Sequence, residues 1–311
     1  MALDESSPSR HGATAPRGVL RRGEPMARHT SWRAGGPADR FYEPADLDDL
    51  ACYLKGLPAD EAVLWIGLGS NLLVRDGGIR GSVIATNAAL DDIATLDGNV
   101  VQVGAGTPCA KVARHCANAG LAGTEFLIGI PGTLGGALAM NAGAFGGETW
   151  PLVQAVDTID RSGNITRRTP DQYTVGYRSV HGPAGEWFVA AQLRLQSGNA
   201  EVARARIKEL LARRTDLQPM GQPSCGSVFR NPPGDYAGRL VEACGLKGMR
   251  IGGAEVSRKH ANFIVNDGTA TAADIEGLIL RVRDTVERMQ GVRLVPEVRI
   301  VGEPAAEGGH E

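Results

Sequence analysis

The stretch Gly129–Gly147, GIPGTLGGALAMNAGAFGG, contains seven glycines in nineteen residues and no charged residue. Glycine loses more conformational freedom on folding than other residues, so this density calls for a reason. The usual reason is a close approach of backbone N–H groups to a ligand, most often a phosphate. Ile130, Leu134 and Leu138 are too apolar for a flexible linker. The stretch therefore predicts a buried ligand site walled by backbone, with a tight turn between core strands as the alternative.

The bulk composition is that of a globular protein with room for two domains. The chain has 311 residues, of which 42% are hydrophobic and 22% charged. Its formal net charge of −2 gives no electrostatic case for a nucleic-acid partner. The five cysteines are widely spaced and form no CxxC pair, so we expect neither a disulfide framework nor a metal site.

The sequence contains no sign of a membrane or secretory segment. No apolar run approaches the roughly 18 residues of a membrane span. The first 25 or so residues are rich in Ser, Pro, Arg and Gly and lack the apolar centre of a signal peptide. We expect a cytoplasmic protein with a disordered tail over residues 1–28 and a flexible tail over residues 304–311. The oligomeric state stays open.

Hydrophobic periodicity predicts a mixed α+β chain. Short Val- and Ile-rich runs separated by Gly, Asp and Asn have strand spacing, at residues 63–66, 72–74, 83–85 and 100–103. Helices are expected over residues 108–118, 201–214 and 236–244 and after the capping box Thr271-x-x-Asp274, which opens an apolar face that includes Met289. A hairpin is expected around residues 152–168, an alternating strand over 187–195 and a last strand over 292–301. The charged helix 201–214 indicates a domain boundary near residues 196–200.

Single motifs taken alone are weak. The run 67–71, GLGSN, follows a strand but fails the dinucleotide fingerprint G-x-G-x-x-G, and no P-loop is present. Its small and hydrogen-bonding residues suit a pyrophosphate or isoalloxazine contact as well as a plain turn. Ser227 beside Gly226 is equally compatible with a ligand contact and with a strand that ends in a turn. By pattern alone, Glu297 after Pro296 reads as an exposed edge carboxylate, and Arg178 and His260 as ordinary surface residues.

The ordered set of motifs is far more specific than any one of them. In chain order it comprises GGPA (35–38), GLGSNLLV (67–74), GIPGTLGGALAMNAGAFGGE (129–148), YRS (177–179), GSVFRNP (226–232), AGRLVEACGLKG (237–248), IGGAEVSRKHANFIVN (251–266) and PEVRIVGE (296–303). Together these strings resemble the UDP-N-acetylenolpyruvoylglucosamine reductase family over residues 29–303. The direct join of GSVFRNP to the AGRLVEACG helix is similar to the shorter subtype of that family.

The resemblance implies an α+β architecture of two domains. Residues 29–198 are expected to form an FAD-binding domain of the vanillyl-alcohol-oxidase or p-cresol-methylhydroxylase type, and residues 201–303 a substrate-binding domain. The cofactors implied are bound FAD and NADPH as hydride donor. The residues expected to contact FAD are Gly67, Gly69, Ser70, Asn71, Gly129, Pro131, Gly132, Thr133, Gly135, Gly136, Asn141 and Gly143.

The resemblance also implies a catalytic trio and a substrate. It assigns the family's serine to Ser227, its arginine to Arg178 and its glutamate to Glu297, against the pattern reading of Glu297. It places Tyr177, Asn231 and His260 near the UDP-sugar; other members have Gln at the position of His260. Many relatives carry a second Glu where this chain has Val295.

The implied reaction belongs to peptidoglycan precursor synthesis, and hence to cell-wall biogenesis, cell shape and division. A hydride passes from reduced FAD to C3 of the enolpyruvyl ether and a proton from Ser227 to C2. Arg178 would stabilise the charge that develops on the carboxylate, and a protonated Glu297 would donate a hydrogen bond to it. The alternatives are an FAD-dependent oxidase for another substrate, a non-catalytic nucleotide-sugar binding protein and a scaffold protein.

Overall fold

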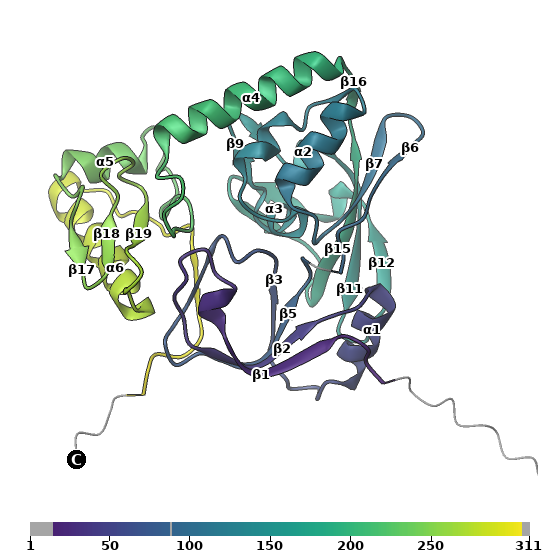
Figure 1. Cartoon of the computed structure of the whole chain (residues 1–311), viewed down its shortest axis with the longest axis horizontal. Helices are drawn as coiled ribbons and strands as arrows, with labels where there is room; N and C mark the ends of the chain where they lie inside the picture. The colour runs from purple at the N-terminus through teal and green to yellow at the C-terminus, as the bar shows by residue number, and fades with distance from the viewer. Residues whose placement is uncertain (1–14, 88, 307–311) are drawn as a thin grey trace, which may run out of the picture.

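The computed structural model describes residues 15–87 and 89–306, which form an N-terminal and a C-terminal part lying side by side (Figure 1). The N-terminal part holds a four-stranded and a five-stranded sheet, and the C-terminal part holds a three-stranded sheet with two helices. Of the tails predicted over residues 1–28 and 304–311, residues 1–14 and 307–311 lie outside the described residues. Within the described residues, no helix is long and apolar enough to cross a membrane.

The four-stranded sheet begins earlier in the chain than predicted. Its order is β1 (Val19–Pro25), β2 (Pro37–Glu43), β5 (Ile79–Ala85) and β3 (Val63–Ile66). Strand β1 pairs antiparallel with β2, whereas β2 and β3 pair parallel with β5. The predicted tail is therefore too long, because residues 19–25 are paired and Met26 is fully buried. Helix α1 (Leu47–Gly56) begins at Asp46, whose side chain accepts a hydrogen bond from the Asp49 amide.

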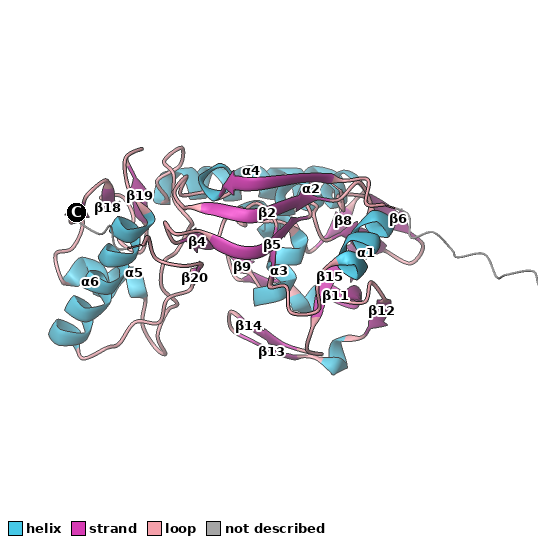
Figure 2. Cartoon of the chain, turned by 90° about the horizontal axis from the view of Figure 1, so that it is seen from below, coloured by secondary structure: helices cyan, strands magenta, loops and turns pink. Residues whose placement is uncertain are grey.

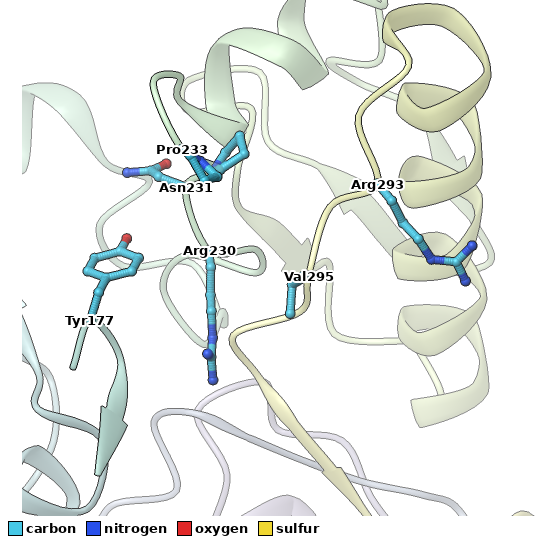
Figure 3. Close-up of a pocket in the computed structure, with 7 residues that line it drawn as sticks. Tyr177, Arg230, Asn231, Pro233, Arg293 and Val295 are labelled. Atoms are coloured by element: carbon cyan, nitrogen blue, oxygen red, sulfur yellow. The ribbon is translucent and has the colours of Figure 1, made fainter. Parts of the chain in front are cut away.

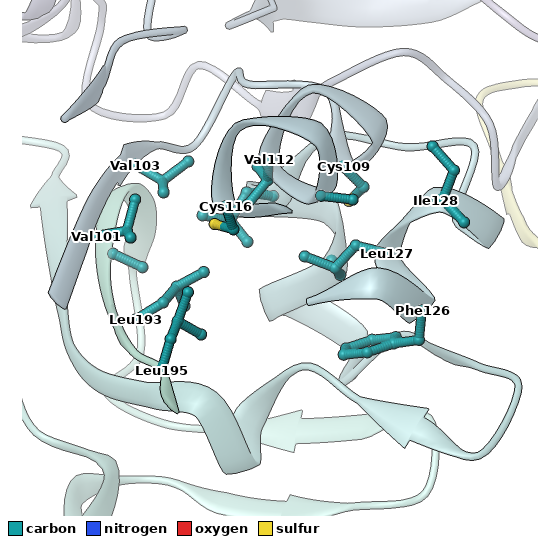
Figure 4. Packing of buried hydrophobic residues seen from close by; sticks show 14 of the residues in the cluster. Val101, Val103, Cys109, Val112, Cys116, Phe126, Leu127, Ile128, Leu193 and Leu195 are labelled. Atoms are coloured by element: carbon teal, nitrogen blue, oxygen red, sulfur yellow. The ribbon is translucent and has the colours of Figure 1, made fainter. Parts of the chain in front are cut away.

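The second sheet is antiparallel throughout and carries the largest apolar cluster. Its order is β12 (Ile165–Arg168), β11 (Val153–Asp160), β15 (Glu186–Arg194), β7 (Val100–Gly104) and β6 (Ile93–Leu96). The β11–β12 hairpin and the β15 strand are confirmed. Helices α2 (Cys109–Asn118) and α3 (Leu134–Met140) and the 3-10 turn η2 (Glu125–Gly129) pack on it. Figure 4 shows buried residues of α2 and η2 together with those of β7 and β15.

Helix α4 (Ala200–Leu217) belongs to the N-terminal part. Ala203, Ile207 and Leu210 are buried in the same cluster as helix α2 and turn η2. In Figure 1 this helix extends from the N-terminal part toward α5. The boundary predicted at residues 198–201 therefore shifts to the end of α4, because the apolar stripe of the helix faces the first core rather than the second.

The C-terminal part follows the helix signals of the sequence closely. Strands β17 (Arg250–Ile251), β18 (Ala254–Val256) and β19 (Ile264–Asn266) pair antiparallel beside α5 (Ala237–Ala243) and α6 (Ala272–Gln290). The predicted capping box is confirmed, since the Asp274 amide donates to Thr271 Oγ1 over 3.1 Å and the Thr271 amide to Asp274 Oδ2 over 2.9 Å. Met289, expected in the apolar face, is 50% exposed.

Several contacts join the parts, among them a strand pairing that Figure 2 shows and a buried tryptophan. Strand β20 (Arg299–Val301) pairs parallel with β4 (Leu72–Val74), so the strand predicted over residues 292–301 is regular only at its end. Trp32 is fully buried in the C-terminal core and donates from Nε1 to the Ile264 carbonyl over 2.7 Å. The remaining short strands are β8 (Leu121–Ala122), β9 (Gly143–Ala144), β10 (Gly147–Glu148), β13 (Thr174–Gly176), β14 (Ser179–His181) and β16 (Gln196–Ser197).

Candidate active site

The loop over residues 67–71 presents consecutive backbone amides. Gly69 has φ +59°, and a Cβ there would lie 1.9 Å from the His29 carbonyl oxygen, so only glycine fits. None of the five amides of residues 67–71 donates a hydrogen bond to another described residue. Successive free amides around a left-handed residue form a concave site for an anion.

The glycine-rich stretch meets this loop. A Cβ on Gly67 would lie 2.3 Å from Thr133 Oγ1, and a Cβ on Gly132 would lie 3.1 Å from Ser70 Oγ. Among the described residues, no group accepts a hydrogen bond from the Gly132 or Thr133 amide. Two loops with free amides therefore face one another across a short gap, and this arrangement fits the pyrophosphate of a dinucleotide such as FAD.

The other predicted flavin contacts divide into two groups. Packing within the protein explains three glycines, because a Cβ would strike Phe145 from Gly129, Ala105 from Gly135 and the Gly147 carbonyl from Gly143. Gly136 differs: a Cβ there would meet only Thr133 Oγ1, at 3.7 Å, and Pro131 is exposed. Neither Gly135 nor Gly136 has positive φ, so a strained backbone is not the reason for glycine at these two positions.

Asn141 is buried and acts inside the protein. It takes a left-handed conformation at the end of α3, and its Nδ2 donates to Glu148 Oε2 over 2.9 Å. Its carbonyl oxygen accepts from Arg178 Nη1 over 3.3 Å, and the Gly143 carbonyl accepts from Arg178 Nη2 over 2.7 Å. The end of the glycine stretch therefore holds the guanidinium of Arg178.

Arg178 and Glu297 come together although 119 positions separate them in the sequence. Arg178 lies in the turn between β13 and β14 with φ +53°. Its Nε lies 3.0 Å from Glu297 Oε1, with side chains 17% and 12% exposed, but without the alignment of a hydrogen bond. The pattern reading of an exposed edge carboxylate at Glu297 is therefore wrong.

The position of Glu297 is fixed by its backbone. Its amide donates to the Val228 carbonyl over 2.7 Å, and its carbonyl accepts from Asn71 Nδ2 over 3.1 Å. Burial raises the pKa of the Glu297 carboxyl above its ordinary value, against the opposing positive charges of Arg178 and Arg230. Asn71, expected to contact the cofactor, thus holds the backbone of the residue that carries the carboxylate.

Ser227 is half-buried, and the next residue, Val228, accepts the hydrogen bond from the Glu297 amide. Its hydroxyl donates no hydrogen bond to a described residue. The next two residues are clamped by Asn262: its carbonyl accepts from the Val228 amide over 2.9 Å, and its side chain exchanges hydrogen bonds of 3.0 and 2.8 Å with the Phe229 backbone. Ser227 and Glu297 are therefore held by neighbouring backbone pairings, with the serine hydroxyl open to a ligand.

Two of the three predicted substrate residues line one cleft. Tyr177 and Asn231 border a cavity of about 560 Å³ between the two parts, together with Arg230, Pro232, Pro233, Arg293 and Val295 (Figure 3). Asn231 Oδ1 accepts the Ala237 amide at the start of α5 over 3.1 Å. His260 is not among the cleft residues: its Nδ1 accepts the Asn262 amide and its ring packs on Phe263, while burial lowers its pKa.

Sequence reasoning missed three residues of this region. Arg230 lines the cleft, Asn262 holds the segment after Ser227, and the buried Cys225 donates from Sγ to the Gly69 and Leu72 carbonyls. Arg230 lies in the GSVFRNP motif and Cys225 directly precedes it, and this closeness to Ser227 was the available signal for both. The described residues contain no group of three or more His, Cys, Asp or Glu side chains that could hold a metal ion.

Comparison with known proteins identifies both parts. Residues 38–169 match a family model described as FAD binding domain, and residues 218–301 match one described as the C-terminal domain of UDP-N-acetylenolpyruvoylglucosamine reductase. The second match begins directly after helix α4, where the packing also divides the chain. These matches confirm the predicted fold class, an FAD-binding domain followed by a C-terminal α+β domain.

Curated relatives and a solved structure indicate the same family as these two matches. The chain is 62% identical over 286 residues to UDP-N-acetylenolpyruvoylglucosamine reductase of Alkalilimnicola ehrlichii, covering 92% of this chain and 96% of the relative. The match to the Methylococcus capsulatus reductase is 62% over 294 residues, with coverages of 94% and 97%. The crystal structure of the Thermus caldophilus reductase is 33% identical with a TM-score of 0.78, covering 91% of this chain and 98% of that one. The chain belongs to the UDP-N-acetylenolpyruvoylglucosamine reductase family.

Proposed function

We propose that this protein reduces UDP-N-acetylenolpyruvoylglucosamine to UDP-N-acetylmuramate, a step of peptidoglycan precursor synthesis in the cytoplasm, with FAD bound and NADPH as hydride donor. The observation that carries the proposal is the meeting of Arg178, Glu297 and the Ser227 strand beside loops with free amides. High identity to reductases over nearly the whole chain supports the same activity.

The two facing loops are the proposed FAD site. Their free amides at residues 67–71 and 132–133 suit a pyrophosphate, and the open space beside Gly136 leaves room for a ligand. FAD, when bound, supplies the hydride chemistry. The protein holds the cofactor and places the reacting side chains around it. We propose that the FAD-binding part runs through helix α4 and that the substrate part spans residues 218–303.

The catalytic work of the side chains follows from where charge develops. Addition of a hydride to C3 of the enolpyruvyl ether leaves negative charge at C2, and this charge spreads into the carboxylate. Arg178, held by two carbonyls, is a fixed cation for that charge. Ser227 then donates its hydroxyl proton to C2. Because a serine hydroxyl is a weak acid, its placement rather than its acidity must make the transfer efficient.

Glu297 has a different role. Burial raises the pKa of its carboxyl, so the protonated form persists to higher pH than for an ordinary glutamate. A protonated Glu297 can donate a hydrogen bond to the developing carboxylate charge, beside the Arg178 guanidinium. The cleft lined by Tyr177 and Asn231 would receive the UDP-sugar.

One anaerobic experiment separates this function from its rivals. The purified protein should carry flavin absorbance, NADPH should bleach it without oxygen, and the enolpyruvyl sugar should restore it with one equivalent of UDP-N-acetylmuramate formed. Recovery with oxygen but not with the sugar would indicate an oxidase. A colourless protein that binds the UDP-sugar would indicate a non-catalytic binding protein. Either result would contradict the proposed function.

A further inference from the structure

Two arginines, Arg230 and Arg293, line the cleft, and Arg178 follows the lining residue Tyr177. Arg178 lies 3.0 Å from the carboxylate of Glu297, and Arg293 lies 3.2 Å from that of Glu287. Arg230, which lies in the same cleft, forms no ion pair with any described Asp or Glu. Its Nε is buried and has no hydrogen-bond partner among the described residues.

The backbone of Arg230 is held firmly in place. Its amide donates to the Val295 carbonyl over 2.9 Å, and the preceding residue Phe229 is clamped by Asn262. The guanidinium is therefore presented from a fixed backbone, and Figure 3 shows it lying between Tyr177 and Val295. A buried N–H of a cation that has no partner is unfavourable in the free protein, and an oxyanion that enters the cleft removes that penalty.

We propose that Arg230 binds an oxyanion of the substrate, either the diphosphate or the enolpyruvyl carboxylate. The inference rests on the proposed function, since it takes the UDP-sugar as the occupant of the cleft. Arg178 is paired with Glu297 at 3.0 Å, whereas Arg230 acts on the same carboxylate only as a more distant positive charge and forms no direct ion pair with a described carboxylate. The planar guanidinium suits both groups, because each presents two oxygens to a pair of N–H donors.

The test compares Arg230 with Arg206, an arginine of helix α4 that is paired with Glu209 and does not line the cleft. In the flavin-loaded full chain, the dissociation constant of the enolpyruvyl UDP-sugar is measured by titrating the oxidised flavin spectrum. Arg230→Gln should raise it about 10- to 100-fold, the loss expected for one charge-assisted hydrogen-bonded contact. Arg206→Gln should change it less than about threefold.

UDP and the full substrate distinguish the two oxyanions. If Arg230 binds the diphosphate, Arg230→Gln weakens UDP as much as the substrate; if it binds the carboxylate, UDP affinity is unchanged and only the substrate is weakened. Arg230→Lys keeps the charge without the planar fork and should fall between wild type and Arg230→Gln. Should Arg230→Gln fail to fold, Arg230→Lys decides, since a wild-type affinity in that variant would overturn the proposal.

The outcomes of these experiments distinguish a failure of this inference from a failure of the proposed function. A wild-type protein that neither binds the UDP-sugar nor is reoxidised by it contradicts the proposed function. A wild-type protein that binds and reacts, with Arg230→Gln binding the substrate and UDP as tightly as wild type, overturns this inference alone. Equal weakening in Arg230→Gln and Arg206→Gln also overturns it, because the overall charge of the protein would then explain the effect.

Discussion

The two facing glycine loops are expected to bind a ligand through backbone amides. The junction between the two parts is expected to bind one through the side chains of Arg178, Ser227, Arg230 and Glu297. The loops at residues 67–71 and 132–133 offer backbone amides, and their side chains are small. The junction offers two arginines, a carboxylate and a hydroxyl from three separate segments. A backbone site is sensitive to an added Cβ, whereas a side-chain site is sensitive to a removed atom. The same chain should therefore respond to substitutions by different rules in the two regions.

The largest effect should come from Ser227→Ala at the junction. Removing the proton donor should slow reoxidation by the enolpyruvyl sugar about 10²- to 10⁴-fold, the usual range for a positioned acid. Flavin content and reduction by NADPH should match wild type, because the hydroxyl serves the proton step alone. Stopped-flow absorbance resolves the two half-reactions, and equal slowing of both would show that Ser227 has been assigned the wrong role.

Glu297 should control the pH dependence of the same half-reaction. Its pKa is raised by burial, so the protonated donor survives above the ordinary value of about 4.3 and is lost as pH rises through the raised pKa. Above that pKa the reoxidation rate should fall about tenfold per pH unit. Glu297→Gln keeps a hydrogen-bond donor that does not titrate and should flatten the profile. A falling limb that persists unchanged in Glu297→Gln would assign it to another group.

Two buried asparagines offer a matched test of placement. Asn262 clamps the Phe229 backbone, whereas Asn266, equally buried, bonds the Trp32 carbonyl and two nearby amides. Alanine at either position should cost about 1–3 kcal/mol of unfolding free energy, measured in urea. Per folded molecule, Asn262→Ala should slow reoxidation about tenfold or more, and Asn266→Ala should not. Equal reoxidation rates in the two variants would show that Asn262 has a structural role only.

The smallest change in stability belongs to the glycine loops. Gly136 and Gly277 both lie in helices with their nearest neighbour 3.7 Å from a built Cβ. Alanine should stabilise the apoprotein by up to about 1 kcal/mol at either position. Gly136→Ala should nevertheless lower the ratio of flavin to protein absorbance, while Gly277→Ala keeps it. A wild-type flavin ratio in Gly136→Ala would remove this glycine from the cofactor site.

The sequence correctly predicted features that depend only on residues close together in the chain. The capping box of α6 formed as expected because Thr271 and Asp274 stand three residues apart, and the hairpin around residues 160–165 formed for the same kind of reason. Glu297 was read wrongly from its pattern because its alternating neighbours describe a strand that residues 292–298 do not form. The candidate catalytic residues came from the family resemblance and stay predictions.

The sequence by itself determined the α+β composition, the glycine-walled loops and, through its ordered motifs, the family. Only the tertiary structure decided that α4 packs on the first core, that Arg178 faces Glu297, and that Asn71 bonds the backbone of Glu297 from 226 positions away. Caps, turns and amphipathic faces depend on residues a few positions apart, so a short stretch of sequence is enough to predict them. Pairs between distant elements depend on the pairing of β4 with β20 and on burial, which exist only once the two parts have packed together.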